Sequence, residues 1–384
     1  MNTKLLGSAL IISGTALGAG MLAIPMVLAQ FGLLYGTLLM VLIWFGTTYS
    51  ALLLLEATIK SGGGLGLNSI ARKTLGKGGQ LISNGLLYAL LICLLMAYIL
   101  GAADLLSQGL SALGLSISFT QSQILFTLIA GAIVACGTGV IDKLNRALFF
   151  IMIASLAITL LVLLPEFSTQ NLAQVSNNDH VGLIRTSAVL FTSFGFMVVI
   201  PSLVTYNGEA TDKQLRNMVI LGSLIPLFCY LCWLFAVVGN LPPEQLKEFA
   251  SVSELMAGFE HDAPWIGTVL SLFTGLALLT SFFGVAMSLF HQNSDTFKQN
   301  RVVTYVLTFV LPLIGAIMAA DQFLSVLAYA GIILVFLAVF VPLAMVYKLR
   351  IANTLSERYA AEGGNAMMIF GLAFGGFLLV SQVI

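Results

Sequence analysis

The sequence has 384 residues, of which 59% are hydrophobic and only 8% are charged, and its formal net charge is zero. A soluble domain carries about 25% charged residues, so this composition excludes an ordinary soluble protein and indicates a helical protein with several membrane spans. Because no basic excess is present, we expect the lipid bilayer and no nucleic acid among its partners.

Eleven apolar stretches are long enough to cross a bilayer as helices and far too long for barrel strands. They lie at about residues 5–30, 34–58, 80–107, 122–140, 145–164, 183–206, 216–239, 264–290, 302–320, 324–347 and 365–384. The first stretch has the full length of a span and no small-residue cleavage site, so we expect no cleaved leader.

The lysines and arginines set the orientation of these spans. If the N-terminus is cytoplasmic, only Arg185 and Lys247 of the 16 basic residues fall outside. Cytoplasmic loops carry the excess of basic residues in membrane proteins. We therefore expect the N-terminus inside and, after eleven spans, the C-terminus on the opposite side of the membrane.

The first span is a poor helix at its centre. Gly14, Gly18 and Gly20 lower the helix propensity, and Pro25 lacks a backbone donor. A break at membrane depth is tolerated where it is buried in protein or lines a polar cavity, as at the binding sites of secondary transporters. Close packing of helices through small residues is the alternative interpretation.

A second stretch, residues 192–201, resembles the first break, and we expect residues 14–20 and 192–197 to be non-helical and to face each other near the middle of the membrane. Met197 follows Met21, and Pro201 follows Pro25, by the same 176 positions. Each stretch lies in the first span of a set of five, and the two sets start on opposite sides of the membrane. The pattern predicts one all-α transmembrane domain (1–384). It would have an inverted five-plus-five repeat, 1–165 and 182–347, and an eleventh helix at 365–384.

A broken helix offers free N–H groups at one half-helix and free carbonyls at the other, which suits the carboxylate and ammonium groups of an amino acid. Hydroxyls and aromatic rings near the breaks supply further candidates, although hydroxyls also bond within their own helix and most rings pack in the core. The predicted substrate-binding residues are Thr15, Gly18, Ala19, Gly20, Tyr98, Ser193, Phe194, Gly195, Phe196, Phe282 and Tyr329.

Ion coupling has fewer candidates. Thr280 and Ser281 are adjacent hydroxyls in the eighth span, which suit a cation site unless they bond within their helix. Only two acids fall within spans, and each is a functional candidate. Glu56 has Lys60 one turn away as a partner, whereas Asp104 near the outer end of the third span is the better proton carrier. The histidines and cysteines form no metal-ligand pattern, so we expect neither metal nor cofactor.

The same motifs support a resemblance to a known family. They are Gly14-Thr15, the run 18–22, the run 51–56, 64–66 with 71–73, 191–196 with 201–202, and 280–282 with 284–286. Together they resemble the bacterial hydroxy/aromatic amino-acid permeases, most closely the tyrosine-specific branch.

This resemblance implies eleven helices in the amino-acid/polyamine/organocation (leucine-transporter-like) fold. It also implies proton-driven uptake across the bacterial inner membrane, with a periplasmic C-terminus. Tyrosine is the implied substrate, with tryptophan or phenylalanine as close alternatives. One departure is Met197, where family members often have histidine, so no role of that histidine carries over.

The sequence thus predicts a proton symporter that imports an aromatic amino acid, and not an enzyme. The alternatives are a sodium-coupled carrier that uses Thr280 and Ser281, and a membrane sensor that binds amino acids without transport. The absence of a large cytoplasmic output domain in the sequence argues against the sensor. No ring of charges or repeated filter loop indicates a channel.

Overall fold

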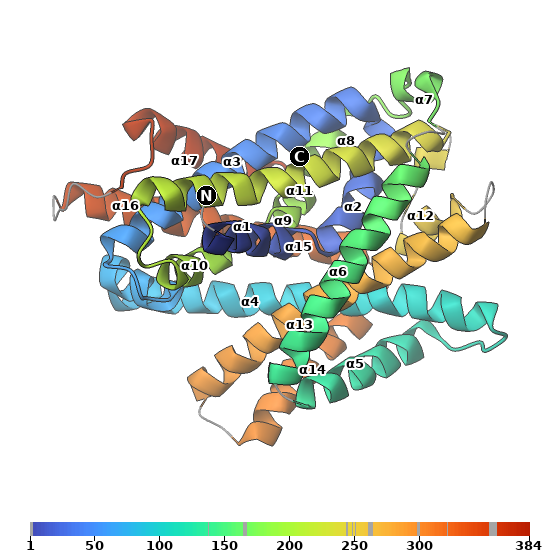
Figure 1. Ribbon diagram of the computed structural model, residues 1–384, viewed down its shortest axis with the longest axis horizontal. Helices are drawn as coiled ribbons and strands as arrows, with labels where there is room; N and C mark the ends of the chain where they lie inside the picture. Colours follow the sequence, from blue (N-terminus) through green and yellow to red (C-terminus); the bar gives the residue numbers. More distant parts are fainter. Residues whose placement is uncertain are drawn as a thin grey trace.

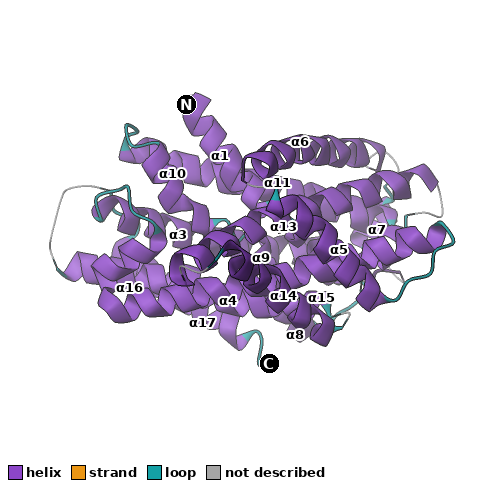
Figure 2. Cartoon of the chain, turned by 90° about the horizontal axis from the view of Figure 1, so that it is seen from below, coloured by secondary structure: helices purple, strands orange, loops and turns teal. Residues whose placement is uncertain are grey.

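The computed structural model describes the chain apart from residues 1–2, 137, 164–166, 243–244, 248, 250, 260–263, 298–299, 321 and 353–358. All regular elements of the described part are helical (Figure 1, Figure 2). The first half contains α1 (Thr3–Ala16), α2 (Ala19–Leu28), η1 (Ala29–Phe31), α3 (Gly32–Lys60), α4 (Leu67–Ala112), α5 (Phe119–Ala135), α6 (Thr138–Leu163), α7 (Thr169–Ala173) and α8 (His180–Arg185). The second half contains α9 (Ser187–Ser193), η3 (Met197–Val199), α10 (Ile200–Tyr206), α11 (Asp212–Asn240), η4 (Gln245–Lys247), α12 (Val252–Ala257), α13 (Pro264–Phe297), α14 (Arg301–Ala319), α15 (Phe323–Val335), η5 (Phe336–Phe340), α16 (Val341–Ile351) and α17 (Gly364–Val380).

Seven helical segments of the described residues are long and apolar enough to cross a membrane. Three shorter apolar helices accompany them, at Phe119–Ala135, Ala147–Leu163 and Gly364–Val380. The prediction of a helical protein with several spans is therefore confirmed. The count of eleven stays a prediction, because the first apolar stretch is divided into α1 and α2, and one helical segment from Gly20 to Lys60 covers parts of two expected spans.

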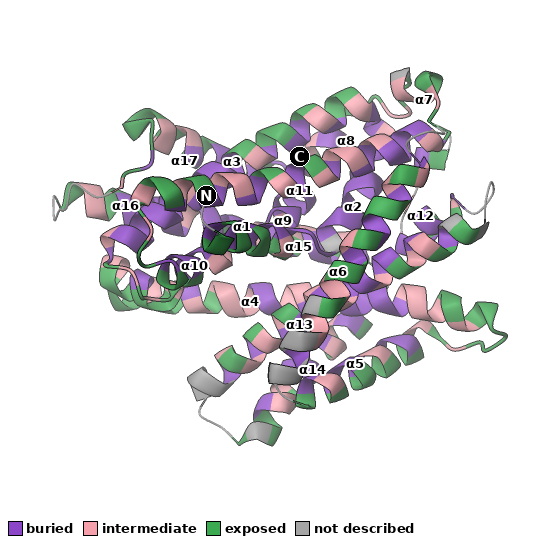
Figure 3. Ribbon diagram, in the orientation of Figure 1, coloured by how far each residue is buried: buried purple, intermediate pink, exposed green. Residues whose placement is uncertain are grey.

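The central helices bury their facing sides against one another. α1 packs against α11, α15 packs against both α4 and α9, and α13 packs against α4 and α6 (Figure 1). The outer faces keep apolar side chains exposed, such as Leu34, Leu128 and Phe228 (Figure 3). Large apolar groups exposed on many outer turns fit a lipid environment rather than water.

The long loop between α11 and α13 is partly helical. Ser251 caps α12 by accepting a hydrogen bond from the backbone N–H of Glu254. α12 then packs against α2, α4 and α13 and so covers one end of the central helices. At the opposite end, α4 begins with a short helical segment that ends at a kink, where Gly76 has a φ of 80°.

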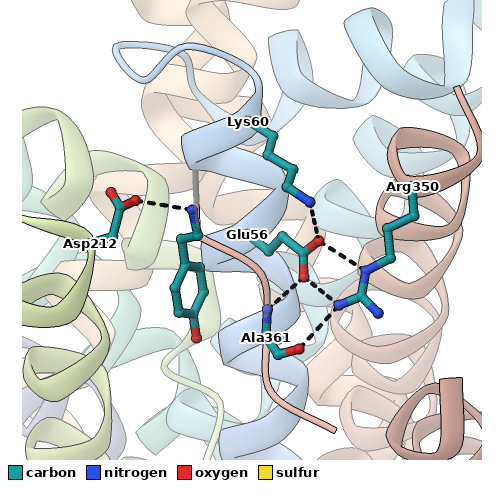
Figure 4. A network of polar contacts seen from close by, with 6 residues as sticks. Glu56, Lys60, Asp212, Arg350 and Ala361 are labelled. Carbon is teal, nitrogen blue, oxygen red and sulfur yellow. Dashed lines mark hydrogen bonds and ion pairs between the residues drawn. The ribbon is translucent and has the colours of Figure 1, made fainter. Parts of the chain in front are cut away.

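A fully buried carboxylate joins α3 to α16 (Figure 4). Glu56 accepts hydrogen bonds from Lys60 Nζ at 2.7 Å and from Arg350 Nη2 at 2.6 Å and Nε at 3.0 Å. The backbone N–H of Ala361 adds a fourth bond at 2.8 Å. The expected pair with Lys60 is confirmed, and the guanidinium from α16 explains why the carboxylate tolerates complete burial.

Candidate functional site

The first break is short and lies at Leu17 and Gly18. α1 ends at Ala16, and Gly18 adopts φ −124° and ψ −144° before α2 begins. The N–H of Gly18 donates to the carbonyl of Ala16 at 2.7 Å. We expected 14–20 to be non-helical, which is wrong at both ends. Gly14 serves packing instead, because a Cβ there would lie 3.0 Å from the ring of Phe149.

The second break covers residues 194–196. α9 ends at Ser193, and the 3-10 turn η3 leads into α10. The expected break at 192–197 is therefore also too long. Pro201 does not interrupt a helix, because it occupies the first turn of α10, where its missing N–H needs no intrahelical partner.

The two breaks lie side by side. The hydroxyl of Ser193 is 3.2 Å from the carbonyl oxygen of Gly20 and 3.0 Å from that of Val189. A Cβ added to Gly20 would lie 2.5 Å from the Cα of Ser193. Only glycine therefore allows α2 and α9 to approach this closely.

Tyr230 of α11 joins both breaks through one hydroxyl. Its oxygen lies 2.6 Å from the carbonyl oxygen of Ala16 and 2.7 Å from that of Ser193, so the last residues of α1 and α9 share one proton donor. The side chain is fully buried, and the ring of Phe194 packs edge-on against it at 5.1 Å. Sequence reasoning missed this residue, although a buried phenol in mid-span needs a hydrogen-bond partner.

A cavity of about 490 Å³ opens beside the two breaks, a volume typical of small-molecule sites. It is lined mainly by apolar side chains of α1, α4, α6, α13 and α15 and by the residues of the breaks. Of the predicted residues it includes Thr15, Gly18, Gly20, Tyr98, Gly195, Thr280 and Ser281. No acidic or basic side chain of the described residues lines it.

The polar groups of this cavity are few. Tyr98 and Ser281 share a side-chain hydrogen bond. A Cβ on Gly18 would lie 2.3 Å from the Ser281 hydroxyl, so this hydroxyl sits directly against the first break. Thr280 instead donates to the carbonyl of Leu276 in its own helix at 2.9 Å. The two adjacent hydroxyls thus have different environments.

Asn145 is a lining residue that sequence reasoning missed. Its side-chain oxygen is buried and has no hydrogen-bond partner among the described residues. A buried polar atom without a partner is uncommon and suits a ligand that donates a hydrogen bond. An amide in the first turn of an expected span gave no signal of this role.

Several predicted residues lie outside the cavity lining. Phe194 and Phe196 are fully buried, and Phe282 packs against Phe126 with 5.1 Å between ring centroids. Tyr329 is 61% exposed on the outer side of α15. The aromatic walls are instead Phe149 and Phe150 of α6. Because a helix buries only one side, the sequence alone did not show which rings face inward.

Two further predicted residues lie at the breaks. Ser193 is the last residue of α9, and its hydroxyl contacts the carbonyl of Gly20. Ala19 is the first residue of α2, and its side chain is not among those that the structure describes.

Asp104 binds the loop helix α12 rather than the cavity. Its carboxylate accepts hydrogen bonds from the backbone N–H of Ser253 at 2.9 Å and from the Ser253 hydroxyl at 2.7 Å. This side chain therefore ties α4 to the segment that covers one end of the central helices.

Known proteins resemble this chain along its whole length. The profile of the tryptophan/tyrosine permease family matches residues 1–382. The chain is 58% identical to Glutamine transporter 2 of Aliivibrio fischeri, with both chains fully covered. It is 36% identical to Tyrosine-specific transport system 1 of Haemophilus influenzae, over 97% of this chain and 94% of that protein. It is 30% identical to a tryptophan-specific transport protein of Pseudomonas aeruginosa, over 97% and 92%.

Proposed function

Because this chain belongs to the tryptophan/tyrosine permease family, we propose that it is a secondary transporter that imports a neutral amino acid through the cavity at the two breaks. The observation that carries this proposal is a pair of broken helices in contact, beside a cavity without charged side chains among its described lining residues. A substrate with a charged side chain would find no partner there.

The backbone of the breaks would hold the two charged ends of the substrate. The first turn of α2 leaves the N–H groups of Ala19 and Gly20 without acceptors within the helix, and a helix N-terminus attracts a carboxylate. Carbonyls of the second break would receive the ammonium group. Tyr98 and Ser281 lie next to the first break and would donate further bonds to the carboxylate.

Two side chains are candidates for the substrate. Glutamine is favoured by the relative with 58% identity and by the unpaired Asn145 oxygen, which would accept a bond from a side-chain amide. Tyrosine is favoured by the more distant relatives and by the apolar lining with Phe149 and Phe150. We place glutamine first, because the identity to that relative is much higher, and keep tyrosine as the second candidate.

The transport cycle would be alternating access in an inverted five-plus-five repeat with eleven spans. The cavity reaches Leu10 and Ile11, which are about half exposed near the start of the chain. The distribution of basic residues in the sequence favours a cytoplasmic position for this end. α12 covers the opposite end, so the structure would represent a state in which the cavity is open to the cytoplasm. The protein would lie in the bacterial inner membrane, with its C-terminus in the periplasm.

We propose proton symport, with Asp104 as the carrier, because its carboxylate faces the helix that covers the outer end. Sodium coupling at Thr280 and Ser281 is the alternative. It is favoured by the position of the Ser281 hydroxyl directly against Gly18 of the first break.

Uptake into proteoliposomes tests the proposal. Labelled glutamine, tyrosine, tryptophan and phenylalanine would be offered under a proton gradient at constant sodium, and under a sodium gradient at constant pH. We expect proton-driven uptake of glutamine above tyrosine, with lysine and glutamate as poor competitors. Uptake of a charged amino acid in preference to all neutral ones would contradict the proposal. If uptake depends on the sodium gradient and Ser281→Ala removes this dependence, sodium and not the proton is the coupling ion.

A further inference from the structure

A second cavity of about 490 Å³ lies between α3, α11 and the start of α17 and shares no lining residue with the cavity at the breaks. It is close to the Glu56 network, where the chain around Ala361 passes α3 (Figure 4). The lining residues are Trp44, Phe45, Thr48, Tyr49, Leu52, Arg216, Ile220, Tyr359, Glu362, Gly363 and Met367. One part of this lining is aromatic and aliphatic, and the other part carries hydrogen-bond donors together with the carboxylate of Glu362, which pairs with Arg216.

Three donors of the lining lack partners among the described residues. The hydroxyl oxygens of Tyr49 and Tyr359 and the Nε of Arg216 are buried and unpaired. Tyr49 as a whole is only 5% exposed. Burial raises the pKa of Tyr359, so its phenol stays a neutral donor at physiological pH. Buried donors without acceptors are costly, and three around one cavity indicate a missing acceptor-rich group.

The guanidinium of Arg216 is already oriented. Its Nη1 pairs with the carboxylate of Glu362, which leaves the Nε edge unpaired at the cavity. The backbone N–H of Tyr359 donates to Asp212 at 3.0 Å and fixes the segment that carries the second phenol. Arg216 and the segment that carries Tyr359 are therefore held in place by contacts within the protein.

The apolar part of the lining points to a ligand with a hydrocarbon tail. Phe45 is 45% exposed on the outer side of α3, and Leu52, Ile220 and Met367 are half-buried around the same cavity. A small hydrophilic anion would bury nothing against these groups. A lipid tail would continue from the cavity along the outer faces of α3 and α17.

We propose that this cavity binds a phospholipid of the cytoplasmic leaflet, with the phosphate at Tyr49, Tyr359 and Arg216 and the first part of a tail against Phe45 and Met367. Guanidinium and hydroxyl donors suit phosphate oxygens, and lipid headgroups bind between spanning helices on the side where basic residues gather. The site is separate from the proposed substrate cavity and does not depend on which substrate is transported.

Native mass spectrometry of the whole chain, purified in detergent, tests this site. The probes are a phosphatidylglycerol with two oleoyl chains, the diacylglycerol with the same chains, and inorganic phosphate. We expect the phospholipid to stay bound, and its affinity to fall roughly tenfold in Tyr49→Phe, as loss of one hydrogen bond to a charged group predicts. Met367→Trp, which fills the cavity from its edge, should reduce binding as well.

The control is Tyr347→Phe, which removes a hydroxyl from an exposed tyrosine outside this cavity and should leave lipid binding unchanged. Equal binding of the phospholipid to wild type, Tyr49→Phe and Met367→Trp would overturn the proposal. If diacylglycerol is retained as well as the phospholipid, the phosphate contributes nothing and the site is only an apolar groove. Stabilisation by inorganic phosphate alone, measured as a shift in Tm, would replace the lipid with a soluble anion.

Discussion

Gly20→Ala tests whether the close contact of the two breaks is needed for transport. The new Cβ would lie 2.5 Å from the Cα of Ser193, whereas carbon atoms in contact prefer about 3.5–4.0 Å. The clash is with backbone, so α2 and α9 would have to separate by roughly 1 Å. That movement would also weaken the hydrogen bond from Ser193 to the carbonyl of Gly20.

The magnitude follows from these contacts. Overpacking costs about 1–3 kcal/mol and the hydrogen bond about 1 kcal/mol, while alanine returns up to about 1 kcal/mol of helix propensity. A net cost of about 1–3 kcal/mol at the breaks corresponds to a 5- to 150-fold fall in kcat/KM. The assay is the initial rate of glutamine and tyrosine uptake into proteoliposomes that contain equal amounts of folded protein.

Gly7→Ala is the matched control, because it lies in α1 and its Cβ would meet nothing within 4 Å. We expect this variant to transport at the wild-type rate with an unchanged or slightly higher Tm. Wild-type uptake in Gly20→Ala would refute the argument that the breaks must touch. Equal losses in both variants would indicate a general defect of α1 and α2.

Three further predictions concern residues that tie the helices together. Tyr230→Phe removes the hydroxyl that bonds the Ala16 and Ser193 carbonyls, which should cost about 1–3 kcal/mol and lower uptake about 5- to 150-fold; a wild-type rate would show that the bridge is dispensable. Glu56→Gln leaves Arg350 without its buried carboxylate and should lower the free energy of unfolding by roughly 3 kcal/mol, measured by thermal unfolding; an unchanged Tm would contradict this. Asp104→Asn should weaken acid-stimulated uptake but leave exchange between equal substrate pools largely intact; an equal loss of both would mean that Asp104 only anchors Ser253.

The location of both breaks could be predicted from the sequence, but their extents could not. Gly18 departs from helical geometry as its propensity indicates. Gly14 remains helical, since its small size serves contact with Phe149. The sequence shows where glycine lowers helix propensity, whereas tertiary contacts determine which of these glycines interrupts the helix.

The cavity residues show the same limit. Thr15, Gly18, Gly20 and Gly195 lie close to the breaks in sequence and line the cavity, whereas Ser193 does not. The rings of Phe282 and Tyr329 do not line it either, because the rotation of α13 and α15 about their axes depends on partners far apart in the chain. Tyr230 connects segments about 40 and 200 positions away, and no local pattern indicates such contacts.

Protection of a single thiol by substrate tests the central claim, that the cavity beside the breaks binds the amino acid. Gly284→Cys places a thiol in the cavity lining, where a Cβ meets nothing within 4 Å. Native Cys136 is exposed outside that lining and serves as the internal control. With Cys93, Cys229 and Cys232 replaced by alanine, glutamine should slow labelling of residue 284 by a maleimide, with half-maximal protection near the KM of uptake, and leave Cys136 unaffected. Unchanged labelling of residue 284 at saturating glutamine and at saturating tyrosine, in protein that still transports, would contradict the account.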